Sequence, residues 1–459
     1  MNKHVKKLLA TSIVACLLPI ASLAQSEYQI DTKIDALYKI ILSQDIVKKS
    51  LEDIKKDDER ALKETITITE IPAPPFKEEK RAKYAIKRFQ ELGLNNAYID
   101  TEGNVIATRK GSGNGPVLVV SAHIDSVFPE GTNVTVVQKG DRYYAPGITD
   151  NARGVATMFS MLKIMQDNKI KTKGDIIFIA DVGEEGEGDL RGVKAFFRDN
   201  KNIDGFFAID GSTLGRIIST AVGSYHYEVT FKGPGGHSYG QFGQVPNPIH
   251  ALGRALDKIS NIQVPKDPKT TFSVGIIEGG TAIGAISQTA TMKIDMRSTD
   301  AKELLKLEKQ ILDAIDKSVV EENDRWNIEP KITVEKKKIG DRPAGSVTND
   351  SPILQAALIS QREVDVKSTL VSASTDANIP VSLGIPALTV GKGGVCKASH
   401  SLDEYYENKD AYKGAQNALL LALGLAGLDG VTEPLLIKRE LIKITKALCN
   451  SSLHKVFFI

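Results

Sequence analysis

The first half of the chain alternates short apolar runs with longer amphipathic segments. The apolar runs at 117–122, 175–181 and 204–210 have the length and composition of buried strands. A helical spacing of apolar positions covers 150–166, between the first two runs. Residues 25–89 are also helical in pattern, around a proline-rich turn. Strands that alternate with helices in this way predict an α/β fold, with a mainly parallel sheet covered by helices.

The pattern changes at residue 221, where apolar and polar residues begin to alternate strictly. Such alternation is typical of strands with one buried face. Strands are predicted at 225–232, 271–280, 285–298 and 331–337, and helices at 250–259 and 301–319. The resulting order, β-α-β-β-α-β, predicts a ferredoxin-like α+β unit. Strand-like runs at 368–376 and 385–390 and a helix at 411–425 then return to the first pattern.

These changes of pattern predict the domain organisation. The first domain should consist of residues 25–220 and 339–430, interrupted by the α+β unit at 221–338. Residues 1–24 have a basic start, an apolar stretch and small residues before Gln25, which predicts a signal peptide and a periplasmic or secreted protein. A lipoprotein signal with Cys16 at the new N-terminus is the alternative. Residues 431–459 form a basic C-terminal extension without a predicted role.

Composition narrows the class of protein. The chain has 459 residues, a formal net charge of +2, and apolar and charged fractions of 41% and 25%, as in soluble globular proteins. This balance gives no indication of nucleic-acid binding or of a general membrane-surface role. Only Cys396 and Cys449 follow the leader, too few for a disulfide framework. For Cys396 a buried structural position is favoured over a metal-ligand role.

Candidate chemistry lies at the ends of the apolar runs and in the glycine-rich loops beside them. Ligands of open α/β sheets gather at the carboxyl ends of strands. The residues concerned are His123, Asp125, Asp150, Glu184, Glu185, Asp210 and His400. Two imidazoles and three carboxylates from this set suffice for a site with two divalent ions, and one of the two remaining acids is left as a proton carrier. Asp125 shares a strand face with His123 and can orient its imidazole, although a plain ion pair is the alternative.

The motifs SAHIDSV, GITDNARGVA, GEEGEG, AIDGS and a late GxxxxxxH resemble those of the M20 metallopeptidase family, over roughly residues 60–425. This family contains carboxypeptidases, dipeptidases, tripeptidases and aminoacylases. The resemblance implies two divalent metal ions, with Zn²⁺ preferred over Co²⁺ or Mn²⁺. It assigns His123 and Asp210 to one ion, Glu185 and His400 to the other, and Asp150 to both. Glu184 is then the general base that takes a proton from a metal-bridging water and returns it to the leaving nitrogen.

The resemblance also assigns roles to the inserted unit, which would act as a lid and as the surface of a homodimer. His237, in GPGGHSYG, would stabilise the developing oxyanion, often from the partner subunit, although a loop histidine is usually only solvated. Arg297 would lie near the substrate, with a surface ion pair as the alternative. Asp376 and Asn378 are candidates for the pocket lining, and a turn cap explains them equally well.

One segment departs from the family pattern. Where the family often has an asparagine and a proline after GGT, the segment GGTAIGAISQ has Gly284 and Ser287. The expected grip on a substrate carboxylate or amide is therefore in doubt. The sequence favours a secreted or periplasmic exopeptidase that hydrolyses short peptides. An N-acyl-amino-acid amidohydrolase is the alternative within the family, and a non-catalytic peptide-binding protein is the alternative outside it.

Overall fold

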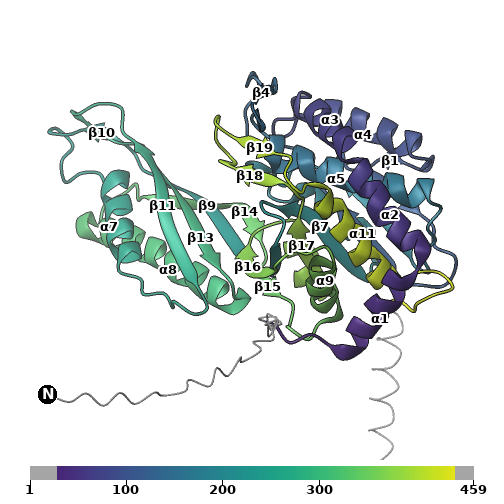
Figure 1. Cartoon of the computed structure of the whole chain (residues 1–459). Coiled ribbons are helices and arrows are strands. Elements are labelled where there is room, and N and C mark those ends of the chain that lie inside the picture. The colour runs from purple at the N-terminus through teal and green to yellow at the C-terminus, as the bar shows by residue number, and fades with distance from the viewer. Residues whose placement is uncertain (1–27, 440–459) are drawn as a thin grey trace, which may run out of the picture.

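The computed structural model describes residues 28–439, which form a large domain and an inserted unit beside it (Figure 1). The predictions for the signal peptide 1–24, for Cys16 and Cys449, and for the extension beyond residue 439 lie outside the described residues. None of the described helices is long and apolar enough to span a membrane.

A nine-stranded sheet is the centre of the large domain, with the order β1-β2-β6-β3-β7-β17-β8-β15 and β16 paired to β8. The strands are β1 (Tyr98–Ile99), β2 (Val105–Arg109), β3 (Val117–Ser121), β6 (Asp175–Ala180), β7 (Gly205–Gly211), β8 (Arg216–Ala221), β15 (Gly345–Ser346), β16 (Thr369–Ala373) and β17 (Ala387–Gly391). The four central strands β6, β3, β7 and β17 are parallel, which confirms the predicted α/β class. The flanking β2 and β8 are antiparallel to their central neighbours, so the whole sheet is mixed.

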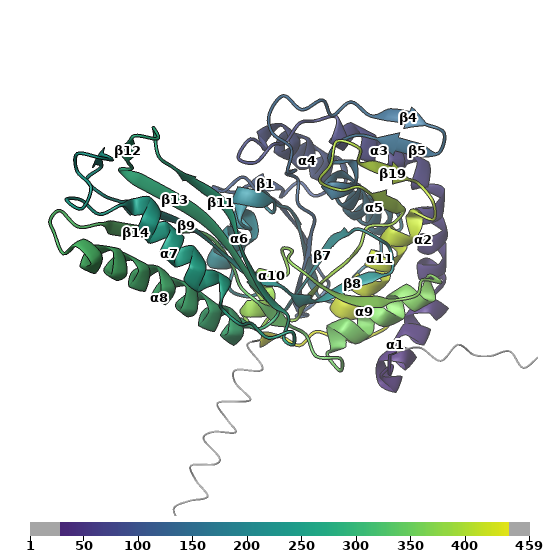
Figure 2. The ribbon, with the colours of Figure 1, turned by 90° about the vertical axis from the view of Figure 1, so that its left-hand side faces the viewer.

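Helices cover both faces of this sheet, in two layers on one of them. The inner layer includes α5 (Arg153–Asp167), α9 (Pro352–Glu363) and α11 (Tyr412–Ala426). The outer layer is formed by α1 (Thr32–Ser43), α2 (Asp45–Lys56) and α3 (Asp58–Thr69), and α4 (Glu79–Glu91) lies beside β2 (Figures 1 and 2). The opposite face packs against α6 (Arg191–Asp199) and α10 (Asn378–Ser382). Because α5 and α11 lie between the sheet and the outer helices, they are apolar on nearly all sides.

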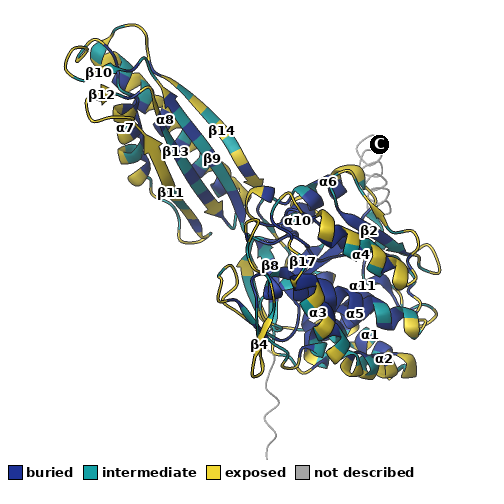
Figure 3. Cartoon of the chain, turned by 90° about the horizontal axis from the view of Figure 1, so that it is seen from above, coloured by how far each residue is buried: buried dark blue, intermediate teal, exposed yellow. Residues whose placement is uncertain are grey.

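The inserted unit has the predicted β-α-β-β-α-β order. Its sheet runs β11-β13-β9-β14, and every neighbouring pair is antiparallel. Its elements are β9 (Gly223–Lys232), α7 (Pro248–Ser260), β11 (Thr270–Gly279), β13 (Thr289–Ser298), α8 (Ala301–Trp326) and β14 (Thr333–Arg342). Alternate residues such as Val229 and Phe231 pack against α7 and α8. The unit extends from the large domain as an arm (Figure 3), and β14 continues past residue 338, where the sequence placed the end of the insertion.

Two smaller sheets complete the fold. A short pair, β10 (Gly236–His237) and β12 (Ala285–Ile286), lies at the far end of the inserted unit. A four-stranded antiparallel sheet is formed by β4 (Val137–Lys139), β5 (Arg142–Tyr144), β18 (Val395–Lys397) and β19 (Tyr405–Glu407). This second sheet was not predicted. It matters for the site because it holds the chain before Asp150 next to the loop that carries His400.

The packing of α11 on α1 depends on Gly424, which has no side chain. The Tyr38 hydroxyl is buried, donates to Leu420 O at 3.2 Å, and accepts from Ser360 Oγ at 3.0 Å. A Cβ atom on Gly424 would collide with this hydroxyl. By contrast, a Cβ on the exposed Gly253 of α7 would meet no atom within 4 Å.

We therefore expect opposite effects from the same substitution in these two helices. Gly253→Ala should raise the free energy of unfolding by up to about 1 kcal/mol, because alanine favours the helix. Gly424→Ala should lower it by about 1–3 kcal/mol, because overpacking outweighs that gain. Thermal and urea unfolding of both variants beside the parent protein measures the difference. A Gly424→Ala protein as stable as the parent would contradict this description of the core.

Candidate metal and active site

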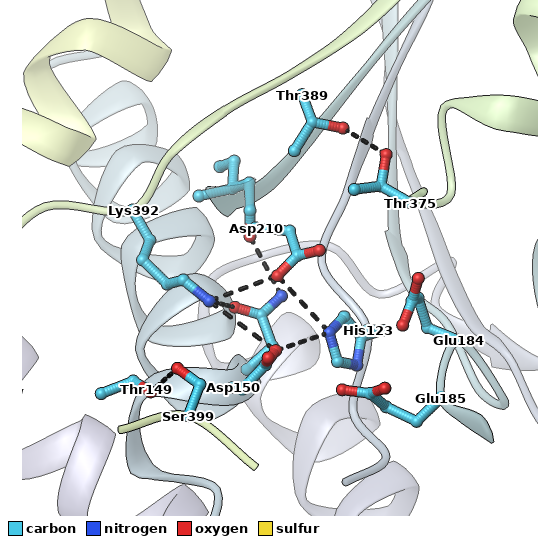
Figure 4. A network of polar contacts seen from close by, with 12 residues as sticks. His123, Thr149, Asp150, Glu184, Glu185, Asp210, Thr375, Thr389, Lys392 and Ser399 are labelled. Carbon is cyan, nitrogen blue, oxygen red and sulfur yellow. Dashed lines mark hydrogen bonds and ion pairs between the residues drawn. The ribbon is translucent and has the colours of Figure 1, made fainter. Parts of the chain in front are cut away.

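The predicted ligands converge at the carboxyl ends of the parallel strands. His123 follows β3, Asp210 lies near the end of β7, and Glu185 lies in the loop between β6 and the short helix η2 (Gly186–Gly188). Asp150 belongs to the turn η1 (Ile148–Ala152) that leads into α5, and His400 to the loop between β18 and β19. Figure 4 shows four of these side chains pointing toward a common centre. The structure thus brings together all five residues that the sequence proposed as ligands.

The two oxygens of Asp150 face different histidines. Asp150 Oδ1 lies 3.2 Å from His123 Nε2, and Asp150 Oδ2 lies 3.1 Å from His400 Nε2. His123 Nε2 is also 3.6 Å from Asp210 Oδ1, and His400 Nε2 is 3.1 Å from Glu185 Oε1. Each histidine therefore has its own second carboxylate, and Asp150 is shared. This is the arrangement expected of a carboxylate that bridges two cations.

The donor set fits divalent metal ions. One ligand atom each of His123, Asp150 and Glu185 lies within 4.8 Å of the others. Imidazole nitrogen and carboxylate oxygen are the donors that Zn²⁺ and similar ions use in catalytic sites. The residues present are therefore suited to hold a dinuclear centre.

The electrostatics of the site are dominated by buried carboxylates. Burial alone would raise the pKa of Asp150, but Lys392, His123 and His400 hold it well below its usual range. Hydrogen bonds to Asp150 and Glu185 raise the pKa of His400 to about 10. Burial acts against the charged form of His123, yet its carboxylate neighbours raise its pKa well above the ordinary value. The cause is the same in each case, because positive and negative partners lie side by side and favour each other's charged form.

Asp125 supports both the imidazole and the acidic loop. Its Oδ1 lies 3.4 Å from His123 Nδ1, on the side of the ring that faces away from Asp150. Its two oxygens also accept the backbone N–H groups of Glu184 at 3.1 Å and Glu185 at 2.9 Å. The orienting contact with His123 was predicted, whereas the hydrogen bonds to the backbone of Glu184 and Glu185 were not.

Glu184 differs from its neighbour Glu185 because it makes no contact shorter than 4 Å with an imidazole nitrogen in the described part of the chain. Burial and the nearby Glu185 raise its pKa well above the usual range. Arg342 holds the segment in place, with Nη2 donating to Glu184 O at 2.6 Å and Nη1 at 3.5 Å from Glu184 Oε1. A carboxyl group with a raised pKa beside a ligand set is suited to accept and return a proton.

A cavity of about 550 Å³ opens over these groups. One wall comes from the large domain, with Asp150, Glu184, Glu185, Asp210 and His400, and the other from the inserted unit, with Ser224, His226, Arg297 and Arg342. Arg297 therefore lines the cavity, as expected for a residue near the substrate. It also pairs with Asp295 at 2.9 Å, the surface ion pair that was its alternative. Asp295 in turn lies 2.8 Å from His226 Nε2.

Two candidate substrate residues are not among those that line this cavity. Asn378 is buried, and its amide donates to Val222 O at 2.8 Å and to Pro343 O at 2.9 Å. Its Oδ1 accepts from Thr375 N, so it acts as the turn cap that the sequence left as an alternative. Asp376 is buried too, and burial and the adjacent Asp181 raise its pKa well above the usual range. Neither side chain is placed to bind substrate in this structure.

His237 is not brought to the cavity within one chain. It lies on β10 at the far end of the inserted unit (Figure 1), where its Nδ1 accepts from the backbone of Tyr239 and Gly240. The segment that departs from the family pattern, residues 279–288, lies beside His237. Ser238 N donates to Gly284 O, and Ser287 follows β12. A catalytic role for His237 therefore requires a second copy of the chain.

Three charged residues that contact the candidate ligands, Glu184 or the turn before Asp150 were missed by sequence reasoning. Arg342 orients Glu184, Lys392 lies against Asp210 and Asp150, and Glu404 holds the turn before the shared carboxylate. Glu404 Oε1 accepts from Thr149 N at 2.7 Å and from Asp150 N at 3.2 Å. None carries a local signal, because isolated charged residues in loops or at strand ends are usually solvated.

Comparison with known proteins decides the family. Residues 119–423 match the model of peptidase family M20/M25/M40. The chain belongs to this family. A Bacillus subtilis (strain 168) relative, the uncharacterized protein YqjE, is 24% identical over 353 residues, which cover 73% of this chain and 91% of that protein. The predicted resemblance is thereby confirmed.

Two solved structures share the fold of this M20 protein. Aminopeptidase PepT from Bacillus cereus ATCC 10987 has a TM-score of 0.66 and 20% identity, covering 79% of this chain and 97% of that one. The Bacillus subtilis protein YXEP, described as a dinuclear metal binding peptidase, has a TM-score of 0.61 and 17% identity, covering 82% and 99%. As an M20 protein, this chain is a hydrolase of peptide or amide bonds, as the sequence predicted.

The geometry distinguishes the roles of two aspartates in metal binding. Asp150→Ala should lose most of its bound metal, because the shared carboxylate contacts both halves of the site. Asp125→Ala should retain more, since an orienting partner changes affinity only about 10–100-fold. Metal content after dialysis against a fixed Zn²⁺ concentration measures both variants. Equal losses would contradict the assignment of Asp150 as the shared ligand.

Proposed function

We propose that this protein is a metal-dependent exopeptidase that hydrolyses short peptides. The observation that carries the proposal is the shared position of Asp150 between His123 and His400, with Glu184 beside it and facing the cavity. When bound, two divalent ions, with Zn²⁺ our first choice, would lower the pKa of a water and polarise the scissile carbonyl. Glu184 then accepts a proton at its carboxylate and delivers it to the leaving nitrogen.

The remaining residues bind and orient. Asp125 and Arg342 hold the His123 ring and the Glu184 segment, so that neither has to reorganise during the reaction. Arg297 and His226 belong to the cavity wall opposite the candidate ligands, where they would face a bound peptide. The volume of about 550 Å³ suits a ligand of a few residues rather than a folded protein.

The cellular location and the cleaved bond complete the proposal. The predicted signal peptide 1–24 supports a location in the periplasm or outside the cell. N-terminal sequencing of the mature protein would separate cleavage before Gln25 from lipidation at Cys16. A panel of free, N-acylated and C-amidated di- and tripeptides would identify the required terminus. Exclusive hydrolysis of N-acyl amino acids would instead establish the amidohydrolase alternative, and binding without turnover would establish a peptide-binding protein.

The proposal includes a homodimer formed through the inserted unit. β11 is an edge strand of the four-stranded sheet, and it exposes Ile276 and Ile277. Ile283 is also exposed, in the loop between β11 and β12. An exposed apolar edge strand is a surface that pairs with another chain. In such a dimer His237 serves the cavity of the neighbouring subunit, where it stabilises the developing oxyanion.

Glu184→Gln should keep its metal and lose turnover. The amide is similar in size but cannot accept the proton, and loss of a general base lowers kcat by about 10²–10⁴-fold. Metal analysis of the purified variant is made beside its peptidase rate. Glu187→Gln, in the adjacent short helix η2 and absent from the cavity lining, is the matched control. A near-normal rate in Glu184→Gln would remove this residue from the mechanism.

His237→Ala should lower kcat by about 10²–10³-fold while metal content stays unchanged, because it loses one oxyanion donor. Random exchange of His237→Ala with Glu184→Gln subunits makes half of the dimers hybrid, each with one complete site. Activity should then recover to about one quarter of the wild-type value if sites are shared in a two-fold dimer. Hybrid dimers, verified by native mass spectrometry, that show no recovery would disprove the sharing.

A further inference from the structure

Lys392 is a buried cation at one end of the ligand cluster. It follows β17 directly, and its side chain is 2% exposed. Its Nζ lies 3.2 Å from Asp210 Oδ1 and 3.8 Å from Asp150 Oδ1, and it donates to Asn151 Oδ1 at 3.0 Å (Figure 4). Buried lysines are rare unless they are paired, so this position has a specific partner set.

The surroundings of Lys392 fix the ammonium group in place. Asn151 Nδ2 donates to Ile209 O at 3.0 Å, which links the lysine to the strand that carries Asp210. Gly154 leaves the necessary room, since a Cβ there would collide with Asn151 Oδ1. The Lys392 carbonyl accepts from Thr157 Oγ1 at 2.7 Å, so both ends of the residue are anchored.

The contacts of this cation fall on one side of the site. Lys392 pairs with Asp210 and with Oδ1 of Asp150, the oxygen that also faces His123. Oδ2 of Asp150 faces His400, which pairs with Glu185. The His123–Asp210 half of the candidate site therefore has a lysine charge in direct contact with it. Among the described residues, Lys392 makes no such contact with the His400–Glu185 half.

We propose that Lys392 weakens cation binding at the His123–Asp210 position, so that the two metal positions fill in order, the Glu185–His400 position first. The inference rests on the proposed two-metal function. Like charges repel strongly in a buried site of low dielectric. The ammonium also contacts Asp210 Oδ1, the same oxygen that lies 3.6 Å from His123 Nε2. Lys392 is therefore a positioning residue, which keeps Asp210 in place and reduces its availability to metal.

Titration of the metal-free protein with Zn²⁺ by calorimetry, and with Co²⁺ by visible absorption, tests this directly. The wild-type protein should bind one ion tightly and a second about tenfold or more weakly, and Asp210→Asn should lose the weaker step. Lys392→Met should tighten the weaker step by about 10–100-fold, the range of effects of residues that contact a ligand. The tighter step should change far less. The control is Lys336→Met, which removes a lysine of β14 that pairs with Asp316 of α8, and it should change neither step.

Lys392→Gln separates charge from packing, because the amide can still donate a hydrogen bond. Tightening in both Lys392 variants supports a charge effect, whereas an unchanged or weaker second step in either folded variant overturns the proposal. Melting temperatures of the metal-free variants verify folding. Two equal steps in the wild-type protein would also overturn it, whether or not the variants fold. A wild-type protein that binds no Zn²⁺ or Co²⁺ would instead refute the proposed function.

Discussion

Buried negative charge is the constraint on which the rest of the structure depends. Asp125, Asp150, Glu184, Glu185 and Asp210 all belong to one site, and each is largely removed from water. Isolated carboxylates would be too costly in such a place, so every one needs a nearby cation or a set of hydrogen-bond donors. Two histidines, Lys392, Arg342 and backbone N–H groups supply these partners. The same compensation makes the site suited to divalent cations, which would add positive charge to the same oxygens.

The fold brings these groups together through the direction of its strands. Parallel strands end at one edge of the sheet, so β3, β6, β7 and β17 deliver His123, the acidic loop, Asp210 and Lys392 to the same place. The remaining ligands reach it by a different route, through the small sheet that joins β5 to β19. Glu404, just before β19, accepts the N–H of Asp150 and so holds the two chain segments of this second route together.

The five candidate ligands were predictable because each follows an apolar run or lies in a glycine-rich motif, and because the motifs resemble those of a known family. The alternation after residue 221 was enough to predict the topology of the inserted unit. Lys392 was not predictable, since a single lysine after a strand has no spacing that identifies the partner across the sheet. Asn378 was equally ambiguous, because its role depends on two carbonyls, of Val222 and Pro343, that are distant from it in sequence.

The inserted unit is connected to the chemistry through few contacts. Val222 and Pro343 flank the unit where the chain passes into it and out of it, and the amide of Asn378 holds both carbonyls together. Arg342, the last residue of β14, donates to the backbone of Glu184. The cavity wall formed by the inserted unit and the Glu184 segment are therefore held by two adjacent residues, Pro343 and Arg342, at the end of β14. The arm and the Glu184 segment therefore share one point of attachment to the rest of the chain.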